Sequence, residues 1–247
     1  MKEYDLLNTL LKKFNVYINS MEESFSDKKP IAKSGEAKLS LKIFTDRDND
    51  DNPIEKISFM TLKDGKIKNK HDKSMLDSGE FTTATFIPKD TFPLPLCAME
   101  VSFHFDKYLR CRADIPPLST DKQYQETFCT PVQELRKKNE DFPGLLPIVS
   151  LPGLEEFSSG GLLAGDFNLA DKDTILKWFL EYAELYLTFL NEREDYPLLK
   201  SPSIIDEGSR RKTAFRQMFK KMTPRILSDT PDLYSDELAG KLGDLLF

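Results

Sequence analysis

Residues 94–117 read LPLCAMEVSFHFDKYLRCRADIPP, two alternating runs separated by a short polar break. In the first run apolar and polar side chains point to opposite sides, which predicts a strand with two different faces. The apolar set is Val101, Phe103 and Phe105, and the polar set is Glu100, Ser102 and His104. The second run ends at two prolines, so we expect a hairpin of two strands at the centre of the fold.

The register of this hairpin decides which polar side chains lie together. A two-residue turn sets Arg112 opposite Val101. A longer loop sets Glu100 opposite Asp114 and gathers both acids on one face with Arg112. Because side chains alternate along a strand, a shift of one residue changes the outcome, and the sequence leaves both registers open.

The rest of the chain supplies more strands in the middle and helices at both ends. The expected strands are 39–43, 54–62, 81–87, 97–105 and 108–115, and the expected helices are 7–21, 120–138, 171–194, 209–227 and 233–246. Strands clustered between helices favour an α+β fold, a three-layer α/β/α sandwich with a central, mainly antiparallel sheet. We expect residues 1–247 to form a single domain.

Composition excludes several classes of protein. Charged residues make up 31% of the chain and the net charge is −6, which argues against nucleic acid as a partner. No apolar run reaches the length of about 18 residues that a membrane span needs. The first residues resemble neither a secretory signal nor a transit peptide, so we expect the cytoplasm, or the plastid stroma if a transit peptide has been removed.

Potential metal ligands are few. There are 3 cysteines, widely spaced and without a Cys-x-x-Cys pair, and 2 histidines. This predicts no metal site and no bound cofactor with a recognisable motif. Electrons for any redox reaction must then come from outside, or from an organic cofactor whose motif the sequence does not show.

A basic segment lies near the C-terminus. Residues 210–225 carry seven basic side chains and no acidic one: Arg210, Arg211, Lys212, Arg216, Lys220, Lys221 and Arg225. The spacing of Phe215, Met218, Phe219 and Met222 predicts an amphipathic helix. Its cations could bind substrate carboxylates, dock an acidic protein, or form a solvated face.

Glu100 is the strongest candidate for chemistry. If helices cover both faces of the sheet, this carboxyl is at least partly removed from water. Burial disfavours its charged form, so it could hold a proton near neutral pH and donate it to a reducible substrate. The alternative is a half-exposed glutamate on a sheet surface.

The central hairpin resembles that of the ferredoxin-dependent bilin reductases and the red chlorophyll catabolite reductases. The run Leu94-Pro95-x-x-x-x-Glu100 matches their Leu-Pro run that ends in an acid, and residues 113–117 (ADIPP) are similar to the Asp-Leu-Pro-Pro of the catabolite reductases. Weaker matches lie at residues 34–39, 186–187 and 245–247.

The resemblance implies reduction of an open-chain tetrapyrrole bound between the sheet and the C-terminal helices. Electrons would arrive singly from an external [2Fe–2S] ferredoxin, and protein carboxyl groups would supply protons, Glu100 first. The expected pigment-binding residues are Met99, Ser102, His104, Arg112, Asp114, Arg216, Phe219 and Thr223.

Three positions depart from the family pattern. A second acid before a proline falls on Thr223, and Asp206, in the loop before the basic helix, is expected to replace it. A histidine and a propionate-binding arginine fall near Thr83 and Ala164. A non-catalytic tetrapyrrole carrier and a basic interaction domain are therefore the alternatives.

Overall fold

The computed structural model describes residues 6–27, 38–46, 51–63, 66–68, 75–77, 81–104, 108–146 and 155–229. Its strands are β1 (Met21–Asp27), β2 (Lys38–Asp46), β3 (Ile54–Lys63), β4 (Lys66–Lys68), β5 (Met75–Asp77), β6 (Phe81–Pro88), β7 (Cys97–His104), β8 (Tyr108–Asp114) and β9 (Leu163–Asn168). Its α-helices are α1 (Leu6–Lys13), α2 (Asn15–Ile18), α3 (Lys122–Lys137), α4 (Lys172–Asn191) and α5 (Pro202–Asp229). Four short 3-10 helices are η1 (Glu155–Phe157), η2 (Leu169–Asp171), η3 (Arg193–Asp195) and η4 (Pro197–Lys200).

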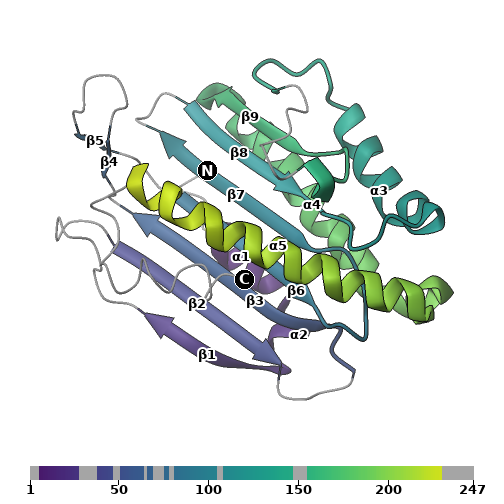
Figure 1. Ribbon diagram of the computed structural model, residues 1–247. Coiled ribbons are helices and arrows are strands. Elements are labelled where there is room, and N and C mark those ends of the chain that lie inside the picture. Colours follow the sequence, from purple (N-terminus) through teal and green to yellow (C-terminus); the bar gives the residue numbers. More distant parts are fainter. Residues whose placement is uncertain are drawn as a thin grey trace.

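Seven strands form one sheet in the order β1-β2-β3-β6-β7-β8-β9, and β4 pairs with β5 beside it. Each neighbouring pair in the large sheet is antiparallel. The sheet lies between α1 and α4 on one side and α5 on the other, as Figure 1 shows. The predicted three-layer sandwich with an antiparallel sheet is confirmed.

The central hairpin adopts neither of the two expected registers. His104 pairs with Tyr108, so Glu100 lies directly opposite Arg112 and Ala98 opposite Asp114. The shared face that the longer loop predicted is nevertheless present, because the observed register differs from that one by an even number of residues.

The side of the sheet toward α1 and α4, called here the core face, is apolar. Phe86 stands there against Phe14 of α1 and Tyr186 of α4, with ring centroids 4.3 and 5.5 Å apart. All three side chains are fully buried. α3 adds Phe128, whose ring meets Phe189 of α4 edge-on at 5.1 Å. This layer supplies most of the buried apolar area that stabilises the fold.

Several elements differ from the expectation, among them β1, β9 and α5. The predicted first helix ends early and Met21–Asp27 form the edge strand β1, because pairing with β2 outweighs the weak strand propensity of this polar segment. β9, expected as loop, pairs with β8. α5 begins at Pro202, so Asp206 lies inside this helix and not in a loop before it. The expected helix 233–246 lies outside the described residues.

Candidate functional site

The α5 face of the sheet carries the polar side chains of the central strands. Strand pairing places one residue from each of six strands in a single row across it: Leu41, Met60, Thr83, Glu100, Arg112 and Ala164. The β2–β3 end of this row is buried and apolar, whereas the residues from β6 to β9 reach solvent. The three positions predicted from the family pattern, Thr83, Glu100 and Ala164, therefore lie on one line.

Glu100 is only partly buried. Its side chain is 31% exposed, and its Oε2 lies 4.0 Å from Nη1 of Arg112, whose side chain is 45% exposed. Glu100 is therefore partly removed from water, as expected, but it is not enclosed. β7 places it on the face toward α5, but the helix leaves this part of the face open to solvent.

Asp114 is the carboxyl that the fold buries. Its side chain accepts hydrogen bonds from the hydroxyl of Ser159 and from the backbone N–H of Ile115, the latter at 2.8 Å. Burial raises the pKa of Asp114 to about 6, although these hydrogen bonds act to lower it. Asp114, which lies on the same face as Glu100, thus exchanges its proton at a pH closer to neutrality than an ordinary aspartate does.

The turn that covers Asp114 comes from residues 158–161. Gly161 donates to the hydroxyl of Ser159 at 3.0 Å, and its carbonyl accepts from Tyr182 at 2.6 Å. A Cβ on Gly161 would lie 2.4 Å from the carbonyl oxygen of Val132, so only glycine fits there. The turn is therefore fixed by hydrogen bonds and close packing.

The other predicted residues of β7 divide between the two faces. Ser102 is buried on the α5 face, in line with Glu100. Met99 is buried on the core face beside Ala84 and Ala113, so the structure does not bring it together with Glu100. His104 ends the strand, and its side chain lies outside the described part of the structure.

Two cations of the basic segment are engaged with the sheet. Nζ of Lys212, a buried side chain, lies 2.7 Å from Glu55 and 2.5 Å from Asp90. Arg216 lies 2.6 Å from the other oxygen of Glu55. The β3–β6 pairing shifts register at Glu55, an irregularity of the kind that re-aims a side chain. Burial acts to raise the pKa of Glu55, but the two cations outweigh it and lower that pKa below its usual value.

These pairs fasten α5 to the sheet. The prediction that Arg216 binds a substrate carboxylate stays a prediction, and in the structure its partner is Glu55. Phe219 is partly buried and its ring lies 4.7 Å from that of Phe215. Thr223 belongs to α5, but its side chain lies outside the described ones. Asp206 is exposed near the start of α5, apart from the row that holds Glu100.

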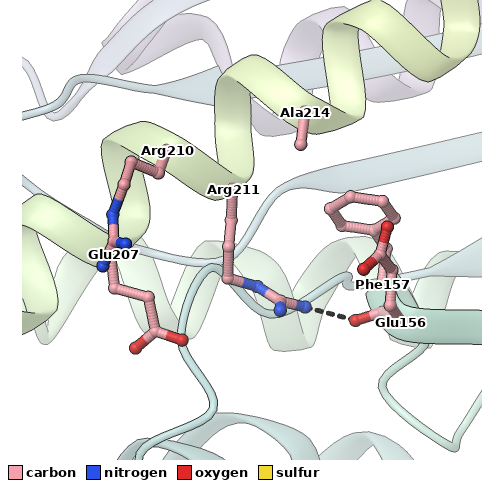
Figure 2. A pocket seen from close by; sticks show the side chains of 6 residues that line it. All are labelled: Glu156, Phe157, Glu207, Arg210, Arg211 and Ala214. Atoms are coloured by element: carbon pink, nitrogen blue, oxygen red, sulfur yellow. Dashed lines mark hydrogen bonds between the residues drawn. The ribbon is translucent and has the colours of Figure 1, made fainter.

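A hollow of about 310 Å³ lies where α5 meets η1, lined by Glu156, Phe157, Glu207, Arg210, Arg211 and Ala214. Figure 2 shows Arg211 reaching from α5 to the backbone carbonyl of Glu156. Its guanidinium also lies 5.2 Å from the centre of the Phe157 ring.

Glu207 makes hydrogen bonds that the sequence did not reveal. It accepts hydrogen bonds from Ser119 at 2.5 Å and from the Thr120 backbone at 2.9 Å. Burial acts to raise the pKa of Glu207, but these hydrogen bonds outweigh it and lower that pKa. Such a contact between residues 87 positions apart leaves no local pattern. The basic segment was visible in the sequence and pointed to Lys212 and Arg216. Nothing in the sequence indicated that Glu55 and Asp90 would be their partners.

Within the described part of the chain, no group of three or more His, Cys, Asp or Glu side chains is placed to hold a metal ion. Among the same residues no helix has the length and apolar character needed to cross a bilayer.

No protein-family model and no curated protein matches the chain. Among solved structures, the chain is similar to phytochromobilin synthase from tomato in complex with biliverdin, with a TM-score of 0.66 and 15% sequence identity. The match covers 96% of this chain and 79% of the tomato chain. The two proteins therefore share a fold.

Proposed function

We propose that this chain reduces an open-chain tetrapyrrole bound on the α5 face of its sheet. The observation that carries the proposal is the fold shared, over 96% of the chain, with a protein solved with biliverdin. The same face bears Glu100 in its central row and the buried acid Asp114 two residues beyond Arg112 on β8.

Each double bond reduced takes up two electrons and two protons. In the proposal the electrons come one at a time from an external [2Fe–2S] ferredoxin. Glu100 supplies the first proton, since it stands in the middle of the row and is reachable from solvent. Asp206 stays the predicted second donor. Arg210 and Lys221, both exposed on α5, favour approach of an acidic electron donor.

The test is spectroscopic. Purified protein mixed with biliverdin should give a structured, red-shifted absorbance band. On addition of ferredoxin, its reductase and NADPH without oxygen, that band should decay into a blue-shifted product. An unchanged biliverdin spectrum at every stage would overturn both binding and reduction, and would leave an interaction domain.

A non-catalytic carrier is the second candidate, favoured by the ion pair between Glu100 and Arg112. In this arrangement the Glu100 side chain orients Arg112, a structural role that requires no reaction. A bound-pigment band that persists under the complete reducing system would identify the carrier.

Glu100→Gln separates binding from reduction. This variant should keep the bound-pigment band but reduce biliverdin about 100-fold more slowly, because loss of a proton donor typically costs at least that factor. Glu126→Gln, at an exposed glutamate of α3, is the control and should leave the rate unchanged. Full activity of Glu100→Gln would remove Glu100 from the mechanism.

A further inference from the structure

Two arginines stand side by side on the α5 face of β8, and they differ in how their guanidinium groups are engaged. Arg110 holds Asp166 of β9 with two hydrogen bonds, Nε to Oδ1 at 2.7 Å and Nη2 to Oδ2 at 2.9 Å. This is the bidentate arrangement in which both oxygens of a carboxylate are satisfied. Arg110 is thus already paired within the chain.

Arg112 makes no bidentate pair of this kind with Glu100. Its contact with Glu100 spans 4.0 Å, which is an ion pair but too long for a hydrogen bond. Its side chain is 45% exposed, the more exposed of the two partners. The donor groups of Arg112 thus face a carboxylate without hydrogen-bonding to it.

Among the described residues, the β9 neighbour of Arg112 is small. On β9 the directly opposite residue is Ala164, whose side chain is a single methyl group. The equivalent position opposite Arg110 holds Asp166, which supplies the carboxylate. The β8–β9 pair thus sets an arginine opposite a β9 residue twice. Arg110 faces the acid Asp166, whereas Arg112 faces Ala164, which has no carboxylate.

We propose that Arg112 binds a carboxylate of the ligand in the place that Asp166 occupies for Arg110, and that this carboxylate displaces Glu100 from Arg112. The inference rests on the proposed function, since biliverdin carries two propionate side chains. A planar guanidinium binds a carboxylate through two parallel hydrogen bonds, which the present contact with Glu100 does not provide. Binding therefore exchanges a long ion pair for a hydrogen-bonded one and leaves Glu100 facing the pigment.

The experiment compares biliverdin with its dimethyl ester, which has the same chromophore but no carboxylate. Dissociation constants of both pigments are measured by absorbance titration. The wild-type chain should bind the free acid about tenfold more tightly than the ester, the value of one charge-assisted hydrogen-bonded pair. In Arg112→Gln this ratio should fall to near one.

Two further variants keep the test decisive. Arg112→Lys retains the charge without the two-pronged geometry and should give an intermediate ratio even if Arg112→Gln folds poorly. Arg110→Gln, the matched control, should keep the wild-type ratio because Arg110 is committed to Asp166. Circular dichroism of each variant checks that the fold is intact.

Displacement of Glu100 makes a second prediction. Glu100→Gln removes the competing anion, so it should tighten free biliverdin roughly two- to fivefold, the worth of an exposed ion pair, and leave the ester unchanged. An acid-to-ester ratio that is the same in wild type and Arg112→Gln would overturn the inference while pigment binding stood. Absence of binding by either pigment would overturn the proposed function and this inference with it.

Discussion

The two faces of the sheet are made by alternate residues of the same strands, yet they differ in every physical respect. On the core face the rings of Phe14, Phe59 and Phe86 are fully buried. On the α5 face the corresponding central positions hold Glu100 and Arg112, and both side chains reach solvent. One face is closed by packing, and the other is left polar and partly open.

The difference shows where a ligand can be accommodated. The helices α1 and α4 are held by continuous apolar contact, which cannot be loosened without a large loss of stability. α5 buries fewer apolar side chains, Ile204 and Phe215, and is also held by ion pairs and hydrogen bonds of Lys212, Arg216 and Glu207. The α5 face can therefore carry polar side chains, as the proposed function requires, while the core face maintains the fold.

The largest expected effect is on the core face. Phe86→Ala should lower the free energy of unfolding by about 3–5 kcal/mol, since it leaves a cavity among rings that are in contact on three sides. Thr83→Ala, three residues earlier on β6 and on the α5 face, should cost only about 0.5 kcal/mol. Urea denaturation measures both. Similar losses for the two variants would refute the contrast between the faces.

The second effect concerns the buried acid of the α5 face. The folded-state pKa of Asp114 is about 6, whereas its ordinary value is 3.8, so the folded chain binds the proton more tightly than the unfolded one. Ionisation therefore destabilises the fold, and the loss accumulates as the pH rises from 4 to 6. It should reach roughly 3 kcal/mol at pH 7 relative to Asp114→Asn, which cannot ionise.

Urea denaturation of the wild type and Asp114→Asn at several pH values measures this difference. The advantage of the variant should appear above pH 4 and level off above pH 6. A difference that does not change with pH would mean that the pKa of Asp114 is not raised.

The sequence predicted those parts of the fold that depend on local periodicity. The alternation of residues 97–105 and the apolar stripe of residues 171–194 gave β7 and α4 nearly to their ends. The strands β1 and β9 escaped prediction because each is an edge strand whose pairing partner, and not its own composition, stabilises it. The hairpin register also escaped, since it depends on a loop geometry that the residues alone did not specify.

The sequence predicted which residues share a face at the candidate site better than it predicted how buried each of them is. Alternation placed Glu100, Ser102 and Arg112 on one face once the register was known. It could not show that Asp114 would be buried while Glu100 stayed partly exposed, because the turn that covers Asp114 comes from residues 158–161. The Lys212 contact with Glu55 joins residues 157 positions apart, so no local pattern revealed it.

The third effect concerns the attachment of α5. Lys212→Met should lower the free energy of unfolding by about 1–2 kcal/mol, because Glu55 and Asp90 lose a buried charged partner but are themselves exposed enough to be hydrated. Amide exchange along residues 205–221 should quicken at the same time. Lys177→Met, at an exposed lysine of α4, is the control. Unchanged exchange in α5 would show that apolar contacts alone hold this helix.

The smallest effect comes from an ion pair of nearly the same length on the other side of the sheet. Lys13 lies 2.6 Å from Glu184, but the two side chains are 27% and 58% exposed, whereas Lys212 is 3% exposed. Because water competes for both charges of the exposed pair, Lys13→Met should cost at most about 0.5 kcal/mol, and 0.5 M NaCl should remove most of that cost. Denaturation at low and high salt measures it beside Lys212→Met. A loss equal to that of Lys212→Met would mean that contact distance, and not burial, determines what an ion pair contributes to this fold.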